Sequence, residues 1–317
     1  MVFDERKGPR MHALEPDNSS YGTTSRSSMA RVYCIVGVPY AAGALGQGAL
    51  AAPAALRRAS LQARARAAGL HCDDAGDVML PASSISVFHK TPPIRHWPMP
   101  RLVWEATRAH VRSVLEAGHI PLVLGGDCSI FVGVAQALAD VVDVSKAHVL
   151  YLDGHIDAEA PRADVCVGAG AMGLEIATTP SPFWPGPILS PSAITAIGCS
   201  RQIHQQIPHV TLAEVRQLGA ERVARLALQR CTQAEALLLH LDVDVIADAE
   251  LPGAYDASED GLTLAEVSIL LRVFLADPRV RALEVTEYCP DNDPGNRGAT
   301  ALVDLLTDAL AAVSTGN

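Results

Sequence analysis

The chain has 317 residues, of which 49% are hydrophobic and 4% aromatic, and its formal net charge is -10 at pH 7. This length and apolar content allow a sizeable core in one large α/β domain or two smaller ones. The negative charge, without a basic stripe, argues against a nucleic-acid partner. No apolar run approaches the roughly 18 residues of a membrane span and the N-terminus lacks a signal-peptide pattern, so we expect no membrane partner.

The cysteine pattern bears on the compartment. The seven cysteines are an odd number and show neither zinc-finger nor C-x-x-C spacing. Such a pattern is typical of a reducing environment rather than of a disulfide framework. We therefore expect a cytoplasmic protein.

The first part of the chain has no hydrophobic period. Residues 1–30 are rich in Ser, charged residues, Gly and Pro, which predicts a disordered extension. The remaining residues, 31–317, are expected to form one folded domain, and we find no sign of a second.

In chain order, the folded part alternates between strand and helix patterns. Apolar β-type runs are expected at 32–38, 120–124, 147–153, 193–199, 236–244 and 280–288. Helical periods are expected at 53–68, 100–118, 130–141, 212–231, 263–276 and 299–314. Residues 73–77 are interpreted as a polar loop and 81–97 as an irregular segment. Near-continuous apolar strands alternating with helices predict a three-layer α/β/α fold with a mainly parallel sheet of about eight strands.

Metal-type side chains follow two of the predicted strands. Asp153, His155 and Asp157 occupy alternate positions, so in an extended chain they point to one side. Alone, they could hold one or two divalent ions, or merely form a polar strand end that caps a helix. Asp242 and Asp244 end another apolar strand in the same way. Because burying so many carboxylates without a cation costs several kcal/mol each, they are either solvated or hold a metal.

Two further candidates follow other strands. Cys128 lies in the turn Gly-Gly-Asp-Cys-Ser after 120–124, and Glu287 lies at the end of 280–288. In parallel sheets ligands bind beyond the carboxyl ends of the strands, where all these groups are expected to meet. Ligation by oxygens and one imidazole suits Mn, with Fe, Co, Ni and Zn as competitors.

At these motifs the chain resembles the ureohydrolase superfamily of arginases, agmatinases and formiminoglutamases, over roughly residues 32–314. The matching stretches are GVPY, GGDCS for the superfamily's G-G-D-H-S, DGHID for D-A-H-x-D, LDVDV for the S-x-D-x-D stretch, and EYCP for E-V-N-P. The resemblance implies an arginase-like fold and a metal-dependent hydrolase of a linear C–N bond. Its substrate would be a guanidino, hydroxyguanidino or formimino compound, and its product urea, a urea derivative or formamide.

The resemblance also implies a metal site of one or two Mn ions per chain. Position by position, it assigns one ion to Asp153, His155, Asp242 and Asp244. It assigns the other to Cys128, Asp153, Asp157 and Asp242. In the superfamily a hydroxide held between two Mn ions attacks the substrate carbon.

Two acidic residues receive further roles from the resemblance. Asp157 is implied to shuttle a proton to the leaving amine, and Glu287 to pair with the cationic head of the substrate. The alternative is an arginase-fold pseudoenzyme that acts as a binding or regulatory subunit. Superfamily members are commonly trimers or hexamers, so we expect a homo-oligomer.

Cys128 departs from the superfamily pattern, which has an imidazole at this position. A similar cysteine is found in the hydroxyarginine hydrolase type, which this chain also resembles at its other motifs. Three interpretations remain open: a weak or altered metal site, a site with one tightly held metal, and a nucleophilic cysteine. We expect metal to be held more tightly at the His155 side, because a thiolate is a softer ligand than Mn prefers.

Substrate recognition is less constrained by sequence. An ungapped alignment with arginases places Glu159, Cys166 and Gly170 at substrate-contacting positions, and His204 is a candidate to line the pocket. An acid at Glu159 would repel a substrate carboxylate, which disfavours L-arginine. His240 lies two residues before Asp242 on the same side of the strand, and is either a hydrogen-bond donor behind the ligands or a ligand itself.

Overall fold

The computed structural model describes residues 31–41, 48–80, 90–186, 188–200 and 204–314. The predicted extension at residues 1–30 and much of the segment expected to be irregular, at 81–89, lie outside the described residues. None of the helices in the described ranges is long and apolar enough to cross a membrane.

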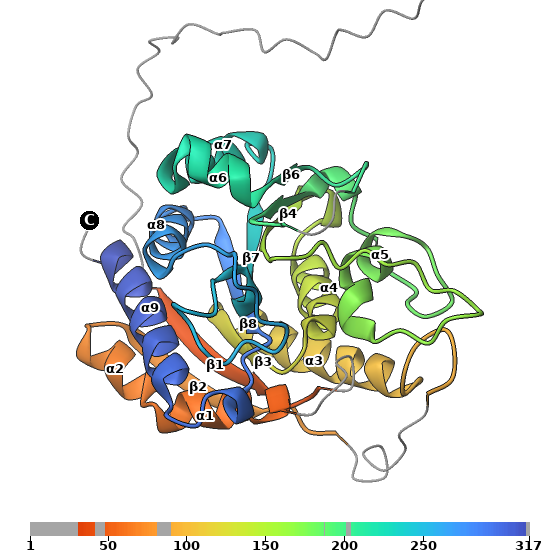
Figure 1. Cartoon of the computed structure of the whole chain (residues 1–317), viewed down its shortest axis with the longest axis horizontal. Coiled ribbons are helices and arrows are strands. Elements are labelled where there is room, and N and C mark those ends of the chain that lie inside the picture. The colour runs from red at the N-terminus through yellow and green to blue at the C-terminus, as the bar shows by residue number, and fades with distance from the viewer. Residues whose placement is uncertain (1–30, 42–47, 81–89, 187, 201–203, 315–317) are drawn as a thin grey trace, which may run out of the picture. The chain divides into compact units, whose positions relative to one another are not determined.

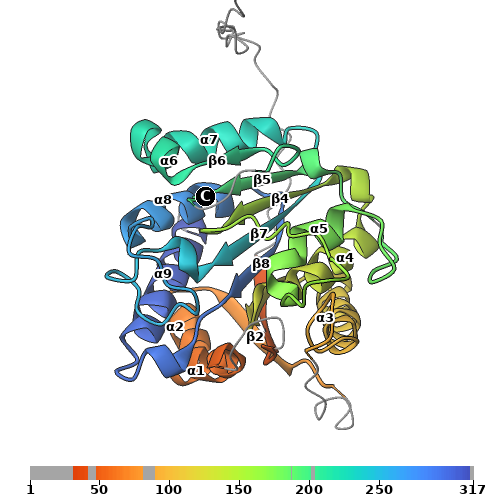
Figure 2. The same ribbon diagram turned by 45° about the vertical axis from the view of Figure 1, so that its right-hand side comes forward.

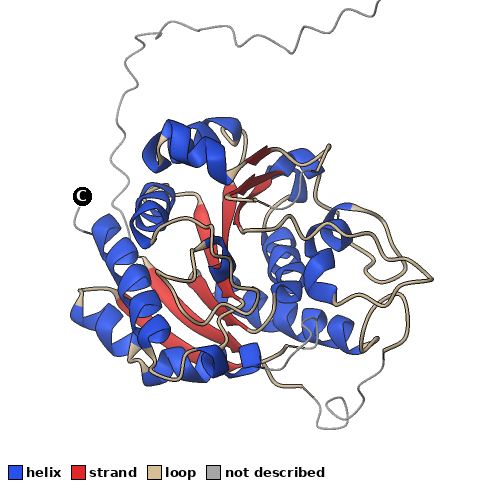
Figure 3. Ribbon diagram, viewed as in Figure 1, coloured by secondary structure: helices blue, strands red, loops and turns tan. Residues whose placement is uncertain are grey.

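One sheet of eight parallel strands runs through the described domain (Figures 1 and 3). In chain order the strands are β1 (Val32–Val38), β2 (His71–Asp77), β3 (Ile120–Gly125), β4 (Ala147–Leu152), β5 (Ile194–Ile197), β6 (His209–Val210), β7 (Ala236–Asp242) and β8 (Val280–Thr286). Across the sheet their order is β2-β1-β3-β8-β7-β4-β5-β6, so β3, β8, β7 and β4 are neighbours at its centre. The predicted mainly parallel sheet of about eight strands is confirmed.

Helices cover both faces of this sheet (Figure 2). One face packs against α1 (Ala52–Arg58), α2 (Leu61–Ala67), α6 (Leu212–Leu218), α7 (Ala220–Arg230), α8 (Leu264–Leu275) and α9 (Arg297–Ser314). The other, called the α4 face below, packs against α3 (Met99–Glu116), α4 (Phe131–Val141) and α5 (Gly173–Thr178). Because strand side chains alternate between faces, Leu239 and Leu241 pack on the first face while Leu238 packs on the α4 face.

The prediction of a polar loop at 73–77 is wrong. These residues belong to β2, which lies at the edge of the sheet beside β1. An edge strand pairs on one side only and can expose its side chains, so it needs no apolar pattern. Arg57 of α1 pairs with Asp74 and Asp77 and holds this strand against the helix.

Two predicted helices are each broken in two. Ser60 separates α1 from α2 with φ 67°, and Gly219 separates α6 from α7 with φ 84°. Both residues adopt the left-handed region, which interrupts an α-helix. The strand predicted at 236–244 ends at Asp242 and that at 280–288 ends at Thr286, so Asp244 and Glu287 stand on the turns beyond.

Candidate active site

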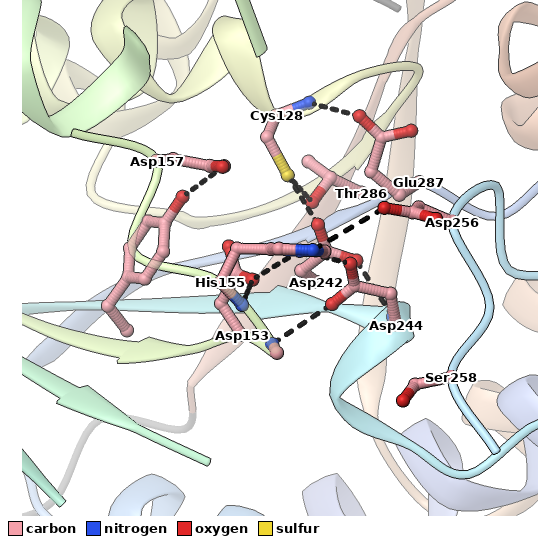
Figure 4. A network of polar contacts seen from close by, with 12 residues as sticks. Cys128, Asp153, His155, Asp157, Asp242, Asp244, Asp256, Ser258, Thr286 and Glu287 are labelled. Carbon is pink, nitrogen blue, oxygen red and sulfur yellow. Dashed lines mark hydrogen bonds and ion pairs between the residues drawn. The ribbon is translucent and has the colours of Figure 1, made fainter. Parts of the chain in front are cut away.

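Four neighbouring strands deliver the predicted site residues to one edge of the sheet. Cys128 follows β3, Asp153 follows β4, Asp242 ends β7, and Glu287 follows β8 (Figure 4). Each of these side chains is at most 8% exposed. Cys128 and Glu287, which are 159 positions apart in the sequence, are thereby brought into contact.

The Cys128 thiol lies in a polar environment. Its Sγ donates to Asp242 Oδ2 at 2.7 Å and lies 3.1 Å from Thr286 Oγ1. The backbone N–H of Cys128 donates to Glu287 Oε1 at 2.9 Å. Burial, and then the nearby Asp242 carboxylate, raise the pKa of this thiol well above its usual value.

His155 is held between carboxylates. Its Nδ1 lies 2.8 Å from Asp244 Oδ2 and 3.7 Å from Asp153 Oδ1, and its Nε2 lies 3.4 Å from Asp256 Oδ2. Hydrogen bonds to Asp153 and Asp244 raise the pKa of His155 to about 11. Burial raises the pKa of Asp153, but the hydrogen bond of His155 and the electrostatic effect of the neighbouring His240 and His155 outweigh it and hold this pKa below the usual value.

Asp157 lies on the opposite side of Cys128 from Glu287 (Figure 4). Its Oδ2 accepts a hydrogen bond from the Tyr151 hydroxyl at 3.0 Å. The backbone at both Asp157 and Glu287 is left-handed, with φ 43° and 62°. Such conformations cost about 1–3 kcal/mol each and occur where a side chain must be aimed.

The other acidic residues of the cluster have raised pKa values because they are buried close to one another. Burial first, and then neighbouring carboxylates, raise the pKa of Asp157, Asp242 and Asp244. The pKa of Glu287 is raised in the same way. These shifts show that burial and mutual repulsion disfavour the charged form of these four acids.

The ligand geometry fits divalent cations. Ligand atoms of Cys128, Asp153, Asp157 and Asp242 lie within 4.8 Å of one another, as do those of Asp153, His155 and Asp244. Asp153 Oδ2 and Glu287 Oε2 are buried and accept no hydrogen bond from any described residue. Buried oxygens of this kind need a partner, and a cation would provide one.

A cavity of about 270 Å³ opens over this cluster. Its described lining is Arg95, Cys128, His155, Asp157, Val167, Gly168, Gly170, Ala171, Asp242, Asp244, Tyr255, Asp256 and Glu287. Of the residues expected to contact substrate, Gly170 lines the cavity, whereas Glu159, Cys166 and His204 do not. Glu159 is exposed, and His204 Nδ1 accepts hydrogen bonds from the backbone of Gln206 and Ile207 within its own turn.

Several residues of the site are not predicted by any sequence motif. Arg95 lies in the segment interpreted as irregular, where its backbone pairs with Val167. Tyr255 and Asp256 lie in a loop without any motif. Glu284 contacts His240 at 2.7 Å, and only the strand register, which pairs these two residues, could have revealed it.

The sequence profile of the Arginase family matches residues 31–312. The chain belongs to the arginase family. Arginase from Staphylococcus aureus strain COL is 26% identical over 287 residues, which cover 86% of this chain and 94% of that protein.

Solved structures of arginase-family proteins share the fold. The native arginase of Bacillus caldovelox gives a TM-score of 0.78 at 23% identity, covering 88% of this chain and 98% of that one. Formiminoglutamase from Trypanosoma cruzi, solved with Mn²⁺, gives 0.70 at 20% identity, covering 90% and 94%. The predicted ureohydrolase resemblance and the assignment to a hydrolase family are confirmed.

Proposed function

We propose that this arginase-family protein is a metal-dependent hydrolase of a linear C–N bond in a guanidino, hydroxyguanidino or formimino compound. It would release urea, a urea derivative or formamide. One observation carries this proposal: four buried or half-buried carboxylates, a thiol and an imidazole meet on the wall of one cavity at the carboxyl ends of four adjacent strands. The relatives named arginase and formiminoglutamase support the same class of substrate.

We propose that two divalent ions occupy the cluster, Mn or alternatively Co, Ni, Fe or Zn. One set of ligands is Asp153, His155, Asp242 and Asp244. The other includes Cys128, Asp153, Asp157 and Asp242. Bound ions would lower the pKa of a water molecule and stabilise negative charge that develops on the substrate.

Asp157 is the proposed proton carrier. Tyr151 holds its Oδ2 at 3.0 Å, which orients the carboxylate towards the cavity. Burial raises the pKa of Asp157, and a raised pKa suits a group that must take a proton from water and return it to the leaving nitrogen. The Tyr151 hydroxyl thus acts as a positioning group.

Glu287 is the proposed anchor for the cationic head of the substrate. Its Oε1 is fixed by the backbone N–H of Cys128, while Oε2 is buried and accepts no hydrogen bond from the described residues. A planar amidinium offers N–H donors that match a carboxylate oxygen at this position.

At the other end of the substrate we propose a carboxylate. Arg95 is the only Lys or Arg among the described residues that line the cavity. A guanidinium has five N–H donors and binds carboxylates in bidentate fashion. Arg95 can therefore donate hydrogen bonds to an anion in addition to its other partners. Glu159, which was expected to repel a carboxylate, lies outside this lining, so it does not contact a molecule bound in the cavity.

A matched substrate panel tests the proposal. Agmatine, guanidinobutyrate, hydroxyarginine and formiminoglutamate would each be assayed with Mn, Co, Ni and Zn. We expect turnover of a carboxylate-bearing compound and little turnover of agmatine. Arg95→Met should reduce the ratio between these two rates. Turnover of no compound by protein that binds two ions per chain would contradict the enzyme and favour a binding subunit.

We further propose a cytoplasmic homo-oligomer with a disordered extension at residues 1–30. Light scattering that showed only a monomer near 33.4 kDa would contradict the oligomer. Limited proteolysis that left residues 1–30 intact would contradict the extension.

A further inference from the structure

A row of three buried side chains lies directly beneath the proposed metal cluster. On the α4 face, Tyr151 of β4 pairs in register with His240 of β7, and His240 pairs with Glu284 of β8. All three are completely buried. Two residues further along β7 and β8, Asp242 and Thr286 form the next row, which contacts Cys128. Nothing in the proposed reaction uses His240 or Glu284.

The His240 ring is fixed in orientation on every side. Tyr151 stacks on it with ring centroids 4.1 Å apart and planes inclined by 1°. Phe131 of α4 meets it edge-on at 5.7 Å. Nδ1 lies 2.7 Å from Glu284 Oε2, and the opposite nitrogen, Nε2, lies 3.8 Å from Cys128 Sγ. The ring therefore presents Nε2 to the cluster.

The contact with Glu284 determines what Nε2 can do. A carboxylate accepts a hydrogen bond from Nδ1–H, and the neutral ring then carries its lone pair on Nε2. Metal-bound histidines characteristically have this arrangement, with one nitrogen on the ion and the other donating to a carboxylate. Glu284 and His240 are thus arranged as a carboxylate–histidine pair that directs the Nε2 lone pair towards the Cys128 side of the cluster.

We infer that His240 is a metal ligand on the Cys128 side, and that it supplies the imidazole that this site lacks at position 128. A thiolate sulfur about 2.3 Å and an imidazole nitrogen about 2.0–2.1 Å from one ion lie about 3.6 Å apart at a tetrahedral angle. The observed separation of Sγ and Nε2 is 3.8 Å. Ligand atoms of Cys128, Asp153 and His240 also lie within 4.8 Å of one another.

This inference rests on the proposed two-metal site and changes its chemistry. A thiolate and an imidazole together form a softer donor set than the carboxylates around His155. The Cys128 side should therefore prefer Zn or Co to Mn, whereas the His155 side should accept Mn. The two positions would be filled by different metals when both are offered.

The direct test is a crystal structure of the full chain loaded with Co²⁺, with the ions located by anomalous scattering. We expect one ion within about 2.1 Å of His240 Nε2 and about 2.3 Å of Cys128 Sγ, and a second ion at His155. An ion at Cys128 that leaves Nε2 uncoordinated would overturn the inference. So would a lone ion at His155, which would leave the proposed metal-dependent function standing. Ions at neither position would overturn both.

Metal titrations of variants separate a ligand from a supporting residue. If His240 binds the ion directly, His240→Gln should weaken binding of the Cys128-side Co²⁺ by more than about 100-fold. Loss of a residue that only supports a ligand typically weakens metal binding by about 10- to 100-fold, and Glu284→Gln should fall in this range. The matched control is His148→Gln, because His148 is equally a buried strand histidine but contacts Thr195. Thermal unfolding of each variant would verify folding. A loss of less than 100-fold in folded His240→Gln would count against ligation.

Discussion

Glu287 accepts a hydrogen bond from the backbone N–H of Cys128 at 2.9 Å, so the acid after β8 is held by the turn after β3. This contact uses Oε1 and leaves Oε2 in the cavity wall. The position of the side chain therefore does not depend on its charge, since an amide oxygen can accept the same hydrogen bond.

Glu287→Gln should consequently keep the fold and lose the charge. If Glu287 pairs with a cationic substrate, kcat/KM should fall by about 10- to 100-fold, in keeping with a hydrogen bond to a charged group worth about 1.5–3 kcal/mol. Steady-state kinetics would measure the fall, and metal content should stay unchanged. Equal activity of both proteins on a cationic substrate would exclude Glu287 from its recognition.

Cys128→His should not by itself restore an arginase-type site. Cys128 is 1% exposed and its Sγ lies 3.8 Å from His240 Nε2, so a second imidazole has no room. We expect overpacking to cost about 1–3 kcal/mol, and the added change His240→Ser to recover part of it. Urea unfolding of both single variants and the double variant would measure the coupling. Additive costs would show that the two side chains do not compete for space.

Gly126→Ala should disrupt the turn that carries Cys128. A Cβ at Gly126 would collide with the backbone carbonyl of Tyr40, which cannot swing aside as a side chain can. We expect a loss of stability of several kcal/mol and of metal binding. The matched control is Gly173→Ala, whose Cβ would lie 3.5 Å from the Cys128 carbonyl oxygen in ordinary contact. A similar unfolding midpoint for the two variants would contradict the collision.

Acid should weaken the fold partly through His148. Burial, and then the charge of Arg279, lower the pKa of His148 to about 4 from 6.5. Below pH 6.5 His148 is protonated in the unfolded chain but stays neutral in the native protein. Its contribution to the free energy of unfolding is therefore fully present above pH 6.5 and is lost as the pH falls from 6.5 to 4. The slope contributed is at most about 1.4 kcal/mol per pH unit. His148→Gln should flatten this part of the profile of unfolding free energy against pH.

The sheet and the position of the site were predictable because both follow from apolar strands and what stands at their ends. Cys128 and Asp153 each follow a buried strand and Asp242 ends one, and parallel strands bring such positions to one edge. β2 was missed because an edge strand carries polar residues, and β6 because it has only two. Neither feature leaves a hydrophobic period in the sequence.

The finer parts of the site depend on relations between strands. The contact of His240 with Glu284 exists because β7 and β8 pair in one particular register, which neither strand encodes alone. The cavity wall likewise comes from loops whose path a sequence pattern does not specify. Glu159 was assigned to the substrate pocket by an ungapped alignment, which cannot account for a loop that takes a different path. In the structure Glu159 lies outside the cavity lining.

The four strand ends that form the cluster also make it a late product of folding. Cys128 and Glu287 meet only when β3 and β8 are docked, and Asp153 and Asp242 only when β4 and β7 are. Ions that need all of them bind the native chain and not the unfolded one, which stabilises the protein by mass action. Cellular abundance of the protein should then follow metal supply, because chains starved of metal would spend longer exposed to proteases.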